Sequence, residues 1–148
     1  KRPRHEHIIK ELTKLNVKIN YIMDGDIAGA LSVIGNNPKN DIYYSTGGGP
    51  EGVIVAAALS CFGGQIQGRL IMDEDERVRA KKLGIQDFNK KYNIDDMVKG
   101  DVIFCATGVT TGDLAKGVED LGNEFKVTTF ALHKSQNIIK TISNIYNK

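Results

Sequence analysis

The amino-acid sequence predicts an α/β fold, in which a mostly parallel or mixed sheet is flanked by helices. Segments with the apolar period of a helix alternate with short, strand-like apolar segments along most of the 148 residues. This alternation is typical of a single α/β domain, here residues 1–148, whose ligands bind at the carboxyl ends of the strands. Three polar or glycine-rich loops follow strand-like segments, so we expect them to share one site: residues 24–26, 46–51 and 107–113.

Four segments are expected to be helices: residues 5–16, 27–34, 50–62 and 73–83. In the first two, apolar side chains recur at helical spacing. Pro3 precedes the first, and Pro50 opens the third, where its missing N–H leaves no bond unmade. The third segment is apolar almost all round, so we expect it to be largely buried. The fourth is charged, and we expect it to be exposed and to end at Gly84.

Strand-like segments lie between and after these helices, at residues 17–22, 41–45, 65–72, 102–106 and 125–132. Residues 88–99 are polar and irregular, with room for a short turn of helix. The tail, residues 137–146, is ambiguous, because its isoleucines have helical spacing while its β-branched content is typical of a strand. We expect a strand that forms a hairpin with residues 125–132.

Composition excludes several classes of function. A hydrophobic content of 41% and a charged content of 26% are ordinary for a soluble globular protein. The net charge of +2, with no basic tract among aromatic residues, argues against a nucleic-acid partner. No apolar run approaches the ~20 residues that cross a bilayer, so no membrane is expected. Cys61 and Cys105 are expected to be buried free thiols, and no secretory signal pattern is present, which favours the cytoplasm.

The most informative stretch is the loop at residues 44–52, with the sequence YSTGGGPEG. Its three glycines leave backbone N–H groups uncovered, and Glu51 adds a carboxylate at the same rim. Such amides with one fixed carboxylate suit an anionic ligand and a metal ion together, hence a phosphorylated small molecule. The loop is neither a Walker loop nor a dinucleotide fingerprint. The alternative is a flexible loop before an ordinary helix, with Glu51 favoured by the helix dipole.

Three further groups have both a functional and a structural interpretation. The two acids of Asp24-Gly25-Asp26 suit sugar hydroxyls or a metal, but Asp26 also suits a helix N-cap with Gly25 easing the turn. Arg2 and Arg4 match phosphate oxygens, but they also suit a solvated terminus. The hydroxyl-rich loop 107–113 is explained equally well by a ligand or by a turn. No Ser/His/Asp or Cys/His set is singled out by its spacing.

Five motifs in this sequence occur in the order and approximate spacing of one enzyme family. They are Pro3-Arg4-His5, Asp24-Gly25-Asp26, GGGPEG at 47–52, Gly68-Arg69-Leu70 and VIFCATGVTTGD at 102–113. From Arg2 to about Tyr146 the chain resembles the class II fructose-1,6-bisphosphatases, part of the lithium-sensitive sugar and inositol phosphatase superfamily. The resemblance implies a layered α/β fold and hydrolysis of the 1-phosphate of fructose 1,6-bisphosphate in gluconeogenesis. It also implies a requirement for Mn²⁺ or Mg²⁺ and a homo-oligomeric full enzyme; some relatives also take sedoheptulose 1,7-bisphosphate.

The resemblance assigns site residues position by position. Three segments fall on substrate-binding positions: Arg2, Pro3 and Arg4; Asp24, Gly25 and Asp26; and Gly48. Glu51 falls on a ligand of the catalytic metal pair, which would polarise the phosphoryl group and lower the pKa of the attacking water.

The resemblance covers only the C-terminal half of the family's enzyme. Most of the family's metal-binding acids belong to the other half, in Gly-Glu-Gly-Glu-like and Asp-Pro-Ile-Glu-Gly-Thr-like segments that do not occur here. The chain also lacks an initiator Met, and its residues 71–84 are shorter than the family's usual charged segment. We therefore expect a substrate-binding half that is inactive alone and belongs to a longer protein. The alternatives are a stand-alone, non-catalytic module that binds a sugar phosphate or nucleotide, and a structural partner of a full-length subunit.

Overall fold

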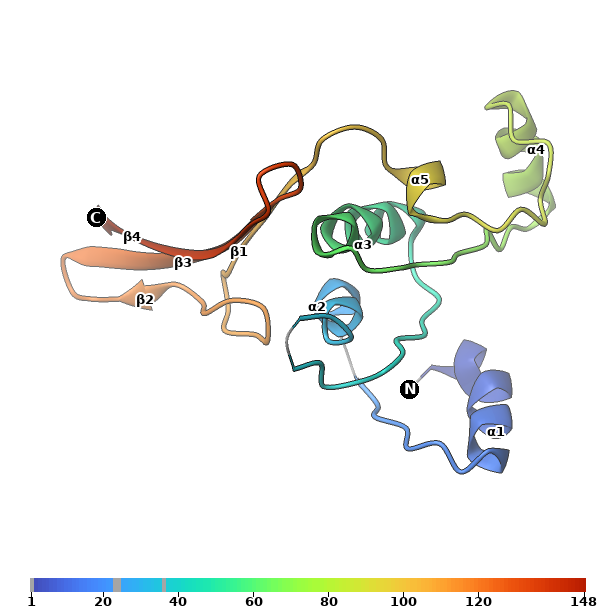
Figure 1. The fold of residues 1–148 in the computed structure, drawn as a ribbon, viewed down its shortest axis with the longest axis horizontal. Coiled ribbons are helices and arrows are strands. Elements are labelled where there is room, and N and C mark those ends of the chain that lie inside the picture. Colours follow the sequence, from blue (N-terminus) through green and yellow to red (C-terminus); the bar gives the residue numbers. More distant parts are fainter. Residues whose placement is uncertain (1, 23–24, 36) are drawn as a thin grey trace.

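The computed structural model describes residues 2–22, 25–35 and 37–148 and confirms the α/β class. Figure 1 shows the arrangement of its helices and strands. The helical elements are η1 (Pro3–His5), α1 (Glu6–Lys14), α2 (Asp26–Leu31), α3 (Gly49–Phe62), α4 (Glu74–Lys82) and α5 (Ile94–Met97). The strands are β1 (Ile103–Thr107), β2 (Glu119–Asp120), β3 (Glu124–His133) and β4 (Ile138–Asn147).

The sheet is built around β3, and every strand pair in the described residues is antiparallel. β4 pairs with β3 from the Glu124–Asn147 pair to the His133–Ile138 pair, as expected for a hairpin. Because β4 occupies one edge of β3 completely, β1 and β2 share the other edge. The expected parallel or mixed pairing is absent from the described residues. β3 and β4 are consecutive strands joined by a four-residue connection, and such strands pair antiparallel.

Three segments expected as strands, residues 17–22, 41–45 and 65–72, are not strands in the structure. They run without helical turns, and among them the structure records only one isolated bridge, between Gly68 and Tyr92. Large apolar side chains on these segments face solvent, with Ile42 83% and Ile71 78% exposed. A strand requires a neighbour for its backbone hydrogen bonds, and the described residues provide none for these segments beyond that bridge.

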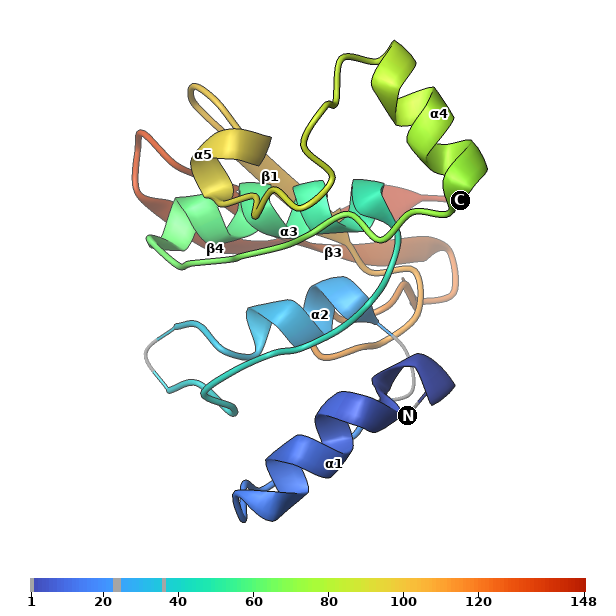
Figure 2. The same ribbon diagram turned by 90° about the vertical axis from the view of Figure 1, so that its right-hand side faces the viewer.

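Helix α3 lies at the centre of the molecule, but the expectation that it is largely buried holds only from Val55 onward, because Val53 and Ile54 in its first half are exposed. On one side, Val55 and Leu59 pack with Ala30 of α2. On the other, Ala58 packs against Phe104 of β1 and Leu132 of β3. Figures 1 and 2 show α2 and α3 next to the β1 end of the sheet, while the β3–β4 hairpin reaches beyond them. This core fixes the start of α3, where the glycine-rich loop ends.

Both cysteines are free, but only one is partly buried. Cys61 on α3 is half-buried, and burial raises the pKa of its thiol. Cys105 is exposed, contrary to the expectation, because side chains alternate along β1 and the neighbouring Phe104 takes the core-facing position. In the part of the chain that the structure describes, no helix is long and apolar enough to cross a membrane.

Candidate functional site

Asp26 opens α2 and is held by two side chains that precede the three glycines. The Tyr43 hydroxyl donates to Asp26 Oδ1 at 2.9 Å, and the Ser45 hydroxyl donates to the same oxygen at 3.2 Å. Burial, followed by the hydrogen bond and charge of Asp26, raises the pKa of Tyr43, so Tyr43 remains a donor. Gly25, the N-cap, has a φ of 85°, which favours glycine. Asp24 lies outside the described residues.

The glycine-rich loop leads directly into α3, as the sequence predicts. Gly48 is the N-cap and Pro50 lies in the first turn, and no side chain among the described residues caps this end of the helix. Backbone N–H groups of the first turn are therefore available to an acceptor. Gly48 and Glu51 are exposed, and the Glu51 carboxylate lies so close to Gly48 that a Cβ there would overlap it. The predicted combination of bare amides and one carboxylate is thus present at this helix start.

The N-terminal segment is attached to the same loop through His5. Pro3, Arg4 and His5 form η1, and the exposed Arg2 is its N-cap. The backbone N–H of Thr46 donates to His5 Nε2 at 3.1 Å, and the His5 ring meets the Tyr44 ring edge-on. In the described part of the chain neither Arg2 nor Arg4 forms an ion pair. Both guanidinium groups are therefore free to meet an anion.

Two of the three expected loops come together, and the third does not. Figure 2 shows η1, the start of α2 and the start of α3 on one side of the molecule. Hydrogen bonds to Asp26 and His5 connect these segments. Loop 107–113, by contrast, makes no hydrogen bond or ion pair to Asp26, His5 or Thr46 within the described residues. Its last residue, Asp113, lies 3.6 Å from Lys39, beyond the other end of α2. The resulting site offers two guanidinium groups, helix-start amides and two carboxylates, a set that suits a phosphorylated polyol.

A family model described as bacterial fructose-1,6-bisphosphatase, glpX-encoded, matches residues 1–146. The chain belongs to the class II fructose-1,6-bisphosphatase family. It is 33% identical over 160 aligned positions to fructose-1,6-bisphosphatase 2 class 2 of Escherichia coli strain K12, a match that covers 98% of this chain and 50% of the relative. It is 34% identical to fructose-1,6-bisphosphatase class 2 of Haemophilus influenzae, covering 98% of this chain and 48% of the relative.

A third relative, from Synechococcus strain JA-3-3Ab, is named D-fructose 1,6-bisphosphatase class 2/sedoheptulose 1,7-bisphosphatase. It is 34% identical, over 99% of this chain and 46% of its own length. The chain thus spans about half the length of these class II fructose-1,6-bisphosphatases. The alignment to the Escherichia coli relative has 160 positions for a chain of 148 residues, so at least 12 positions fall opposite gaps in this chain. The proposed shortening at residues 71–84 remains a prediction about where such gaps lie.

The described residues of this family member do not by themselves form a metal centre. Among them, no group of three or more His, Cys, Asp or Glu side chains is placed to hold a metal ion. Glu51 is exposed and makes no ion pair within these residues, so it fits the part of a single ligand.

The structure adds three residues that the sequence did not single out for this site: His5, Tyr43 and Ser45. Each contacts a partner 17 to 41 positions away in the chain. His5 belongs to the motif Pro3-Arg4-His5, Ser45 to the loop at residues 44–52, and Tyr43 to a segment predicted as a strand. Their positions in or next to these motifs were the one available signal.

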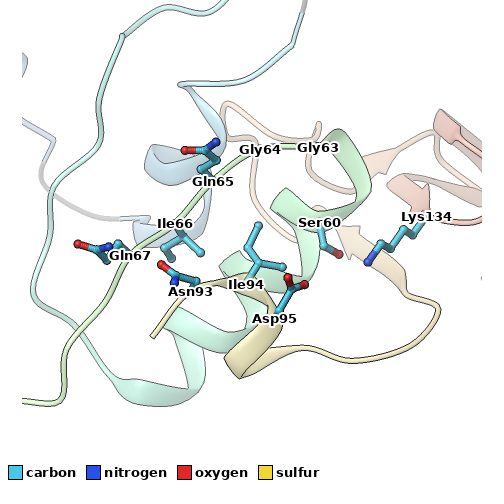
Figure 3. A pocket seen from close by; sticks show the side chains of 10 residues that line it. All are labelled: Ser60, Gly63, Gly64, Gln65, Ile66, Gln67, Asn93, Ile94, Asp95 and Lys134. Carbon is cyan, nitrogen blue, oxygen red and sulfur yellow. The ribbon is translucent and has the colours of Figure 1, made fainter. Parts of the chain in front are cut away.

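An open hollow of about 660 Å³ lies at the other end of α3, away from this site. Figure 3 shows its lining, in which Lys134 and Asp95 approach Ser60 from different elements. The Ser60 hydroxyl already donates to the Ala57 carbonyl at 2.8 Å. The hollow therefore presents one cation and one anion, but no unpaired buried group that would select a ligand.

The structure also brings together an aspartate, a histidine and a serine, although not as a catalytic triad. The Ser135 hydroxyl donates to Asp101 Oδ2 at 2.7 Å, and His133 Nε2 lies 2.7 Å from the same oxygen. A triad requires the two ring nitrogens to contact different partners, whereas here Nε2 faces both Asp101 and Ser135. The hydrogen bonds from Ser135 and then His133 hold the pKa of Asp101 well below its usual range. The cluster ties the end of β3 and the β3–β4 turn to Asp101, two residues before β1.

Proposed function

We propose that this chain is the substrate-binding half of a metal-dependent fructose-1,6-bisphosphatase that hydrolyses the 1-phosphate of fructose 1,6-bisphosphate in gluconeogenesis, in the cytoplasm. The observation that carries the proposal is the joining of three motif segments by the His5–Thr46 and Ser45–Asp26 hydrogen bonds. Family membership over residues 1–146 supports the same function. The full enzyme, on this proposal, is a homo-oligomer.

In the proposed site each segment meets a different part of the substrate. Arg2 and Arg4 hold a phosphate, because guanidinium groups match its oxygens in a bidentate manner. Asp24 and Asp26 meet the sugar hydroxyls. Since Asp26 Oδ1 already accepts from Tyr43 and Ser45, Oδ2 is the oxygen that remains for the substrate.

The start of α3 provides the remaining proposed contacts. Gly48 offers its backbone to the substrate, and Glu51 contributes one ligand to Mn²⁺ or Mg²⁺. Such an ion provides a Lewis acid next to the phosphate that is cleaved. The relatives from Synechococcus are named for both bisphosphatase activities, which supports sedoheptulose 1,7-bisphosphate as a second substrate.

A second candidate function is a non-catalytic module that binds a sugar phosphate or nucleotide. The observation that favours it is the absence of a metal-binding cluster from the described residues. The two functions differ in the part that Glu51 plays. It contributes to binding only with a metal in the first, and it is dispensable in the second.

Calorimetric titration with fructose 1,6-bisphosphate, with and without Mn²⁺, tests the proposal. We expect weak binding that Arg4→Ala reduces by about tenfold or more, since a hydrogen bond to a charged group contributes about 1.5–3 kcal/mol. Arg79→Ala, on the exposed face of α4, is the matched control and should bind as the wild type does. Glu51→Ala should lower affinity only when Mn²⁺ is present. Binding by the wild type that Arg4→Ala leaves unchanged would contradict the proposed site.

A further inference from the structure

Among the described residues, His5 makes the one hydrogen bond between the N-terminal segment and the glycine-rich loop. Its Nε2 accepts from the Thr46 backbone N–H at 3.1 Å, across 41 positions of sequence. The edge-on contact with Tyr44, at 6.2 Å between ring centroids, fixes the ring from a second side. Thr46 directly precedes the three glycines, which have no side chains to hold the loop by packing. The His5 hydrogen bond therefore restrains the loop directly before residues that cannot restrain it by packing.

The acceptor role defines the state of the His5 ring. A nitrogen that accepts from an N–H carries no proton itself, so the ring is neutral, with its proton on Nδ1. Burial of the ring, followed by the charge of Arg4, lowers the pKa of His5, which favours this neutral state. The charged and titratable groups that face the ring are Arg2 and Arg4 on its own segment, Asp26 at the start of α2, and Tyr44.

We propose that His5 is a positioning residue, whose neutral ring holds the Thr46 N–H and so sets the start of the glycine-rich loop beside Arg2 and Arg4. The role of this arrangement in binding a phosphorylated ligand rests on the function proposed above. Arg2 and Arg4 would bind the phosphate directly, whereas His5 acts through the loop. No step of the chemistry passes through the ring.

The proposal has a defined pH dependence. The pKa of His5 is lowered on folding, so the hydrogen bond is fully present above the unfolded value of about 6.5. As the pH falls from there through the lowered pKa of the folded state, Nε2 gains a proton and can no longer accept. The Thr46 N–H is then released, and the loop becomes less restrained.

Amide hydrogen exchange at Thr46, measured by NMR on the 148-residue chain, tests the contact without any ligand. In the wild type, Thr46 should be protected at pH 7.5. After correction for intrinsic exchange, it should lose at least about threefold of its protection as the pH is lowered stepwise from 7.5 to 4, through the folded-state pKa of His5. His5→Phe keeps a ring against Tyr44 but removes the acceptor, so Thr46 should be unprotected throughout this pH range. His5→Gln retains an acceptor that does not titrate, so protection should persist throughout it. His7→Phe, an exposed change in α1 two residues further along the chain, is the control and should match the wild type.

Titration of the same variants with fructose 1,6-bisphosphate tests the positioning role. We expect His5→Phe to weaken binding by at least about threefold and His5→Gln to restore most of it. Equal Thr46 protection in His5→Phe and the wild type would overturn the inference, and so would unchanged ligand affinity in His5→Phe. Failure of the wild type to bind would overturn the proposed function for this chain, while the exchange result would still decide whether His5 anchors the loop.

Discussion

At Gly47 the chain has no room for a side chain, although the backbone there needs no unusual conformation. A Cβ at this position would lie 2.8 Å from Asp26 Oδ2. The carboxylate cannot simply turn away, because Tyr43 and Ser45 both donate to its other oxygen. Asp26 therefore requires glycine at position 47. The sequence suggests another reason for the three glycines, namely the close approach of a ligand to the backbone.

Gly47→Ala should lower the free energy of unfolding by about 1–2 kcal/mol, because the shifted carboxylate loses one or both hydrogen bonds at ~0.5–1.5 kcal/mol each. Gly52→Ala is the matched control. A Cβ at Gly52, inside α3, meets nothing within 4 Å, and alanine has the higher helix propensity, so we expect no loss. Urea denaturation followed by circular dichroism measures both. Equal midpoints for the two variants would show that the Asp26 contacts do not restrain the loop.

At the residue scale, sequence analysis could name chemical types but not all of their partners. Glycines before a helix start and an acid in its first turn follow from local rules, and the structure places Gly48 and Glu51 accordingly. Asp26 was predicted as either a ligand contact or a helix N-cap. It is the first residue of α2, and its side chain is held by Tyr43 and Ser45. Contacts across 17 to 41 positions depend on the fold, so neither these two bonds nor that of His5 could be read from spacing.

At the scale of elements, the β3–β4 hairpin depends on one face of β3. Leu132 is 1% exposed and packs with Ala58 and Phe104, whereas its cross-strand neighbour Ile139 is 54% exposed. Because these residues lie opposite each other on neighbouring strands, truncating each in turn compares a buried position with an exposed one. Leu132→Ala should cost about 2–5 kcal/mol of stability and Ile139→Ala less than about 1.5, because only the first leaves a cavity. Thermal or urea unfolding measures both, and similar costs would mean that the hairpin is not anchored through Leu132.

Elements with local signals were predicted well. The four helical segments appear with small shifts at their ends, and Asp73 and Glu76 form the capping box that starts α4. The hairpin also appears, because both strands and the short connection lie next to each other in the sequence. The strands expected at residues 17–22, 41–45 and 65–72 were wrong. Strand pairing depends on a partner elsewhere in space, which periodicity within a segment cannot supply.

At the scale of the whole molecule, the candidate site contains many groups suited to a phosphorylated ligand and few suited to a metal ion. Groups suited to the substrate come from three segments, but only Glu51 represents the metal ligands of the resemblance. The chain covers about half of each relative, and its surface carries large exposed apolar side chains on the segments that lack strand partners. Exposed apolar groups of this kind are typical of a surface that another polypeptide segment covers.

The 148-residue chain alone should release no phosphate from fructose 1,6-bisphosphate above the Mn²⁺-only blank. Metal-assisted phosphate transfer with two ions requires several oxygen ligands around them, and the described residues offer no such cluster. The Escherichia coli relative, assayed in parallel by inorganic phosphate release, provides the positive control. Turnover by the chain that requires Mn²⁺ and disappears in Glu51→Ala would show that it assembles a metal site of its own. Turnover that survives Glu51→Ala would point to a contaminant, because the only proposed metal ligand of the chain would then be dispensable.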